Sequence, residues 1–266
     1  SLSTGSNNIF QGYLSGASGN YITGANNIGI GQDTFKMLSS GTGNVAIGLN
    51  ALNKITAGNY AVAIGQSALL NNTSDDNVAV GGVALTANTS GGNNTAVGRG
   101  ALQAVVTANN NTALGYLAGN ATTGSDCTAI GSLALSLSTA GDQNTAVGSY
   151  AMGGGITTGG FNTAIGVSAG SSLTGGTSNT FLGTEAGVNT TTGASNICIG
   201  RAAVTSAIGA SRELSIGSAT YYVGTNGAAN TYFTSATALS TGVLPATCGF
   251  WRVIINGTPR LIPVYA

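Results

Sequence analysis

The chain has 266 residues, of which 44 are glycine, 5% are charged and none is histidine, and its formal net charge is zero. A zero net charge gives no electrostatic attraction to nucleic acid or to an anionic membrane, and the lack of histidine removes the commonest general base and metal ligand. A hydrophobic share of 42% nevertheless predicts a packed chain, because disordered chains combine low hydrophobicity with high net charge.

Membrane, redox and metal signals are weak. No apolar run reaches the roughly 18–20 residues that a membrane helix needs, so no membrane insertion is expected. The first ten residues, SLSTGSNNIF, lack the basic start and apolar core of a signal peptide. Cys127, Cys198 and Cys248 are far apart and odd in number, which fits neither a disulfide framework nor a zinc site. We expect no metal and no cofactor.

An internal repeat fills residues 1–217. Its signature is NxAϕG, where ϕ is Ile, Val or Leu, and it first closes clearly on Gly31. Successive closing glycines are 16 to 18 residues apart, mostly 17, and degenerate copies end at Gly12 and Gly217, which makes about 13 repeats. Self-similarity at a fixed short period predicts a solenoid. The remaining repeat glycines are Gly48, Gly65, Gly81, Gly98, Gly115, Gly131, Gly148, Gly166, Gly183 and Gly200.

Each repeat reads as one coil of a parallel β-solenoid. Side chains alternate across a strand, so Asn and Ala share one face and the aliphatic residue takes the other. The glycine marks a bend. A second short strand is expected over the following Ala and Leu, as at Ala101–Leu102, before a Gly/Thr/Asn turn returns the chain. The predicted fold is therefore all-β, a parallel β-roll of about 13 coils with a 17-residue period.

The repeat also predicts self-association. Both faces of a coil carry small or aliphatic residues, and only one of them can fill the interior of the roll. The other would form a long exposed apolar stripe, which monomers rarely tolerate. Contact with identical chains would bury this stripe.

The period stops after Gly217, and residues 218–266 differ in kind. All three prolines and the single tryptophan lie there. FWRVIINGTPRLIPVYA predicts a β-hairpin: a strand over 250–255, an Asn256-Gly257 turn and a strand to Val264. A cap for the last coil is one interpretation, and a receptor-binding tip is the other. The candidate binding residues are Tyr221, Tyr222, Tyr232, Phe233, Trp251, Arg252, Asn256 and Arg260.

The repeats NVAIGLNAL, NTAVGRGAL and NTAIGVSAG resemble the head repeats of trimeric autotransporter adhesins and, more closely, arrays in bacteriophage tail fibres. In such heads each chain forms a left-handed parallel β-roll, and three rolls pack about one axis. The resemblance implies a homotrimeric fibre that attaches to a host cell-surface glycan or protein. It implies a virion location as a tail fibre or, alternatively, the surface of a bacterium.

We expect a binding fibre and not an enzyme. Asp75 and Asp76 are adjacent loop acids, which are usually solvated, and a thiol nucleophile without histidine is improbable chemistry. Cys127 and Cys198 replace repeat residues and are expected to be buried. Two minor alternatives are a glycan-degrading tip and an ice-binding solenoid. The second would use the Thr column Thr95, Thr112, Thr128, Thr145, Thr163 and Thr180, which Val45, Val62 and Val78 interrupt.

Overall fold

The structure is a computed structural model that describes residues 4–16, 21–217, 219–225, 231–235, 248–255 and 258–265, with side chains through residue 217. It divides into two compact units, Ser1–Ala236 and Thr237–Ala266. The regular secondary structure in the described ranges consists of β-strands, with no helix. The all-β class is therefore confirmed for this part of the chain.

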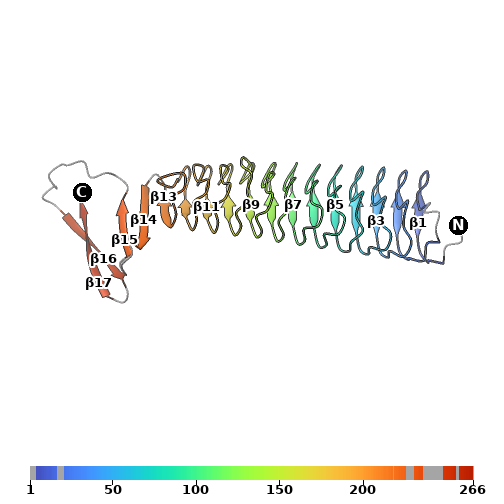
Figure 1. Cartoon of the computed structure of the whole chain (residues 1–266), viewed down its shortest axis with the longest axis horizontal. Helices are drawn as coiled ribbons and strands as arrows, with labels where there is room; N and C mark the ends of the chain where they lie inside the picture. Colours follow the sequence, from blue (N-terminus) through green and yellow to red (C-terminus); the bar gives the residue numbers. More distant parts are fainter. Residues whose placement is uncertain are drawn as a thin grey trace. The chain divides into compact units, whose positions relative to one another are not determined.

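The first unit is built on one 15-stranded sheet in which neighbours in sequence are neighbours in space (Figure 1). Strands β1 to β12 have three residues each and β13 has four. Their bounds are β1 Ile9–Gln11, β2 Ile28–Ile30, β3 Val45–Ile47, β4 Val62–Ile64, β5 Val78–Val80, β6 Thr95–Val97, β7 Thr112–Leu114, β8 Thr128–Ile130, β9 Thr145–Val147, β10 Thr163–Ile165, β11 Thr180–Leu182, β12 Ile197–Ile199 and β13 Glu213–Ile216.

All pairings from β1 to β13 are parallel, and each residue lies opposite its equivalent in the next repeat. Between β6 and β7, for example, Ala96 pairs with Ala113 and Val97 with Leu114. One repeat is thus one turn, and the parallel β-solenoid of about 13 coils is confirmed. We number the coils 1 to 13 by their closing glycines, from Gly12 to Gly217.

The two faces of the sheet have the composition that the alternation predicts. The Asn and Ala of each repeat point inward, and the aliphatic residue before the glycine points outward. Ala113 is fully buried, whereas the adjacent Leu114 is 48% exposed. The small Ala side chains let the opposite wall of the coil approach the sheet closely, so the interior is narrow and closely packed.

A ladder of buried asparagines runs up the inside of the roll. The backbone N–H of Asn94 donates to Oδ1 of Asn77 at 2.9 Å, and the N–H of Asn111 donates to Oδ1 of Asn94 at 2.9 Å. The Asn94 Nδ2 group also donates to the carbonyl of Ala108 in the next coil at 2.9 Å. The Asn94 side chain thus satisfies two buried backbone groups of the next coil, which explains why Asn recurs at this position.

The ladder is incomplete beside the two shortest coils and at Cys127, which occupies the ladder position of coil 8 and has no amide. Coils of 16 residues follow Gly65 and Gly115. Below the first, the ladder residue is Ala61, which has no amide. Below the second it is Asn111, whose buried Nδ2 has no hydrogen-bond partner in the described structure.

The second strand predicted over Ala and Leu is wrong. This segment is a turn, in which Leu52, Leu69, Leu85, Leu102 and Met152 adopt φ between +46° and +49°. Left-handed backbone is unfavourable for such residues, but tertiary contacts compensate. The N–H of Leu102 donates to the Ala118 carbonyl of the next coil at 3.0 Å, and its side chain lies in the core. Ladder hydrogen bonds therefore continue without an extended strand.

The repeat glycines are required by the bend. Gly115 has φ of +138°, and a Cβ there would lie 2.6 Å from the carbonyl oxygen of Gly131 directly above it. The bends of successive coils are stacked so closely that no side chain fits between them. Glycine suits this position both by its backbone conformation and by its lack of a side chain.

In the core, a large side chain on one wall of a coil is accompanied by a glycine on the facing wall. Phe181 replaces Ala in coil 11 and is fully buried. Gly170 and Gly187 stand where other coils have Leu, and a Cβ on Gly170 would lie 2.7 Å from the Phe181 ring. Coil 2 shows the opposite exchange, with Gly29 at the Ala position beneath the ring of Phe35. A large side chain on one wall is thus accommodated by glycine on the other.

The parallel array ends at β13, where Glu213 stands in place of the ladder Asn. Its N–H still donates to Oδ1 of Asn196 at 3.0 Å, but its carboxylate turns back and accepts from the N–H and hydroxyl of Ser206 in its own coil. Strand β14 (Ala219–Thr225) then pairs antiparallel with β13, and β15 (Thr231–Ser235) pairs antiparallel with β14.

The second unit contains one antiparallel pair, β16 (Cys248–Ile255) and β17 (Thr258–Tyr265). Ile255 pairs with Thr258, so the predicted hairpin is confirmed. Its two connecting residues, Asn256 and Gly257, lie outside the described residues.

Candidate interaction surface

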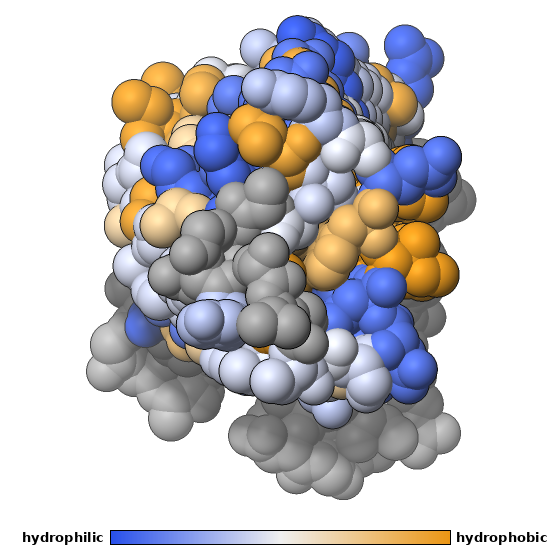
Figure 2. Space-filling model, turned by 90° about the vertical axis from the view of Figure 1, so that its right-hand side faces the viewer, coloured by the Kyte–Doolittle hydropathy of each residue, from blue (hydrophilic) through white to orange (hydrophobic). Residues whose placement is uncertain are grey.

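The outward face of β1 to β13 is a continuous surface with two columns of side chains. The aliphatic column, which precedes the glycines, is exposed or half-buried throughout. Figure 2 views the first unit from the N-terminal end of the roll and shows hydrophobic side chains at its surface. After a Gln in coil 1, the aliphatic column consists of Ile30, Ile47, Ile64, Val80, Val97, Leu114, Ile130, Val147, Ile165, Leu182, Ile199 and Ile216.

The second outward column changes character along the roll. It is aliphatic in coils 1 to 5, from Ile9 to Val78, and is threonine in coils 6 to 11, from Thr95 to Thr180. It becomes aliphatic again at Ile197 and Leu214. The predicted apolar stripe therefore exists, and in coils 6 to 11 it carries a regular row of hydroxyl and methyl groups.

Two rims border this outward face. We define the entry rim as the two residues before each ladder Asn, and the exit rim as the two residues after each bend glycine. The entry rim carries four of the seven acids, and its only cation in the described structure is Arg212. The exit rim carries Asp33, Arg99, Glu185 and Arg201. The four entry-rim acids are Asp75, Asp76, Asp126 and Asp142, and all are exposed.

Most of these charges have no partner of opposite sign within the described chain. The one ion pair in that part joins Lys36 to Asp33, with Nζ and Oδ1 3.1 Å apart. Asp75 accepts the backbone N–H of Asn59 at 2.7 Å, and Asp126 accepts the Asn110 amide at 2.9 Å. The exposure predicted for Asp75 and Asp76 is confirmed.

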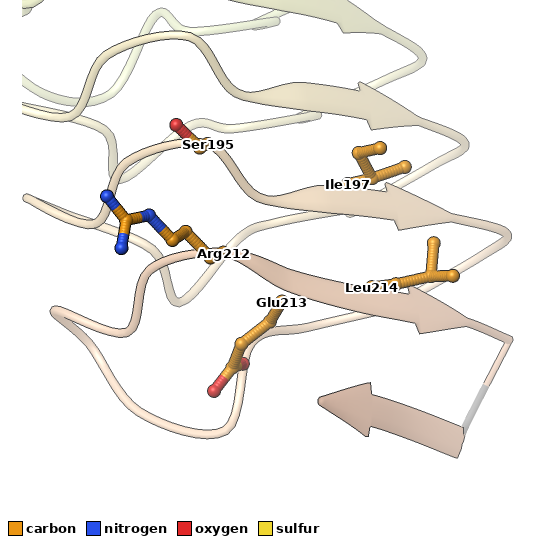
Figure 3. A pocket seen from close by; sticks show the side chains of 5 residues that line it. All are labelled: Ser195, Ile197, Arg212, Glu213 and Leu214. Atoms are coloured by element: carbon orange, nitrogen blue, oxygen red, sulfur yellow. The ribbon is translucent and has the colours of Figure 1, made fainter. Parts of the chain in front are cut away.

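A shallow depression of about 220 Å³ lies on the outward face between β12 and β13 (Figure 3). Ile197 and Leu214 project from its floor, while Ser195 and Arg212 border it at the start of the strands. The side chain of Glu213 points away toward the inside of the roll. The depression thus combines an apolar floor with one cation.

The described cysteines are unsuited to nucleophilic chemistry. Both Cys127 and Cys198 are buried and free, as predicted. Burial raises the pKa of the Cys127 thiol, and burial together with the nearby Glu213 charge raises the pKa of Cys198 to about 11. Because the thiolate is the reactive form, neither side chain offers a nucleophile near neutral pH. In the described residues no three His, Cys, Asp or Glu side chains gather as a metal site.

The residues predicted to bind a receptor are distributed over both units. Tyr221 and Tyr222 lie in β14, Tyr232 and Phe233 in β15, Trp251 and Arg252 in β16, and Arg260 in β17. Asn256 lies outside the described residues. The register places Arg252 opposite Leu261, and Val253 opposite Arg260. The assignment of these residues to a binding site stays a prediction.

No protein-family model, curated protein or solved structure matches the chain. No helix in the described ranges is long and apolar enough to cross a membrane. The charged rims were not identified from the sequence, although their signal is present there. Asp76 lies five residues before its closing glycine and Arg99 lies one residue after its own, which places them at opposite ends of their strands.

Proposed function

We propose that the chain is a structural and adhesive fibre protein, the distal part of a phage-type tail fibre, which assembles as a parallel homotrimer and attaches to a host cell-surface glycan or protein. The repeat resemblance supports the class of protein. The head of a bacterial trimeric surface adhesin is the alternative within the same architecture. Thirteen coils at a strand spacing of about 4.8 Å give a rod of roughly 60 Å, which suits a shaft.

The exposed aliphatic column is the observation that carries this proposal. Its side chains point away from the core of their own chain, yet they are aliphatic in twelve consecutive coils. A contiguous apolar stripe of this length marks an interaction surface. Only a partner with the same repeat would match it coil by coil, and a second copy of the chain provides that repeat.

Light scattering of the full chain tests the assembly. The expected mass is three times 25.8 kDa. Ile130→Asp should dissociate the assembly, because a buried unpaired carboxylate is strongly unfavourable, and Thr73→Asp on an exposed loop should leave it intact. A wild-type chain that is monomeric at micromolar concentration contradicts the proposal.

Host recognition is assigned to residues 218–266. Arg252 and Arg260 would grip carboxylate or phosphate groups and the aromatic residues would stack on sugar rings. The double variant Arg252→Ala and Arg260→Ala should lose binding to bacterial cells, whereas Lys54→Ala on the roll should retain it. Equal binding by the two variants would place recognition elsewhere.

The central threonine row favours a second candidate, an ice-binding solenoid. Thr95 to Thr180 present hydroxyl and methyl groups outward on a parallel sheet, with a regular spacing of about 4.8 Å. This candidate needs the face to be free of a partner. Thermal hysteresis in a monomeric sample would support it, and a trimer without hysteresis would exclude it.

A further inference from the structure

We propose that neighbouring copies meet with opposite rims, so that the Asp75 and Asp76 carboxylates of one copy lie beside the Arg99 guanidinium of the next, and that this charge pairing fixes a parallel, unshifted arrangement. The inference rests on the self-association proposed above and names the contact that orients it. Its occupant is a second copy of this chain.

The separation of these charges within one chain is the first step. Asp76 precedes β5 and Arg99 follows β6, so the two side chains lie at opposite ends of adjacent strands, about 15 to 20 Å apart along extended chain. They cannot pair within their own roll. All three side chains are exposed, and Arg99 has no acidic partner in the described structure.

The second step is the height of the charges along the fibre. Asp75 and Asp76 belong to coil 5, and Arg99 follows the bend of coil 6. In a parallel, unshifted assembly the entry rim of one copy meets the exit rim of the next. The opposite charges then differ in height by one coil, which a long arginine side chain spans.

The antiparallel alternative brings like charges together. A twofold axis perpendicular to the fibre pairs each rim with itself and sets coil 5 against coil 9. Asp75 and Asp76 would then face Asp142 of the other copy, and no cation of the entry rim lies nearer than Arg212 in coil 13. The apolar columns supply the attraction in either case, whereas the charges determine which orientation is adopted.

Cross-linking of the full-length chain tests the orientation. The variant carries Asp76→Cys and Gly82→Cys, which mark the two rims of coil 5; a side chain at Gly82 meets no atom within 4 Å. We expect a short bis-maleimide to join Cys side chains of different copies in this variant. Asp76→Cys alone should give no cross-linked species above the wild-type background.

Charge exchange tests the pairing itself. Arg99→Asp should weaken association about fivefold per interface, and adding Asp76→Arg should restore it. Lys54→Asp is the control, because Lys54 is exposed and lies on neither rim. Efficient cross-linking by Asp76→Cys alone, or a failure of Asp76→Arg to restore association, overturns the pairing while the assembly stands. A monomeric wild-type chain overturns the assembly as well.

Discussion

The inward and outward faces of the same strands differ in the constraints that determine which residue types occur there. Inside, each position is restricted by volume and by hydrogen bonding, so Phe181 is accompanied by Gly170 and Gly187, and the ladder Asn recurs. On the outward face, Ile, Val and Leu replace one another from coil to coil, and no compensating change in side-chain size accompanies them. The inner face explains how one chain folds, and we propose that contact with further copies of the chain explains the outer face.

The largest expected effect on stability is in coil 11, where Phe181 packs against glycine. Phe181→Ala should lower the free energy of unfolding by about 3–5 kcal/mol, because it leaves a cavity. Adding Gly187→Leu should recover part of the loss, since Leu occupies this position with positive φ in other coils. Gly187→Leu in the wild-type background should be destabilising. Chemical denaturation of the four proteins measures the coupling, and strictly additive changes would contradict the exchange.

Replacing a bend glycine should have the next largest effect. Gly115→Val combines a φ of +138° with contact to the Gly131 carbonyl, and should destabilise each chain by about 1–3 kcal/mol. Gly82→Val is the matched control, because its Cβ would enter open space and should change stability by under about 0.5 kcal/mol. Similar melting temperatures for the two variants would refute the role of the bend.

The asparagine ladder predicts a graded effect. Asn94→Ala removes two hydrogen bonds to neighbouring coils and should cost about 2 kcal/mol. Asn111→Ala removes only the bond that Oδ1 accepts from Cys127 N–H, because its Nδ2 has no partner, and should cost about half as much. An equal or greater loss for Asn111→Ala would show that the amide has a use that the structure does not account for.

The smallest effect on the stability of the single chain is expected in the outward aliphatic column. Leu114→Thr should change the stability of a dissociated chain by less than about 0.5 kcal/mol, since the side chain is half exposed. Denaturation at dilutions where light scattering shows only monomer isolates this quantity. A large loss there would mean that the outer column supports the fold of the single chain.

The period, the strand positions, the parallel stacking and the two faces all follow from the sequence, because alternation and a fixed spacing have few structural solutions. The turn at Leu102 could not be predicted. Ala–Leu satisfies a strand pattern equally well, and only hydrogen bonds from the next coil make left-handed leucine favourable. The exchange between Phe181 and Gly187 was equally hidden, since the two residues meet only across the closed coil.

The orientation of the hydrogen bonds has a mechanical consequence. They run along the axis of the roll, so a pulling force along that axis is carried from each coil to the next through one layer of hydrogen bonds. The layer with the fewest hydrogen bonds yields first. The layers above Ala61 and Cys127 lack both hydrogen bonds that a ladder amide makes, and the layer above Asn111 lacks one of them. Under load the roll should therefore open first between coils 4 and 5 or between coils 8 and 9, and a force trace should show segments released at those joints before the rest.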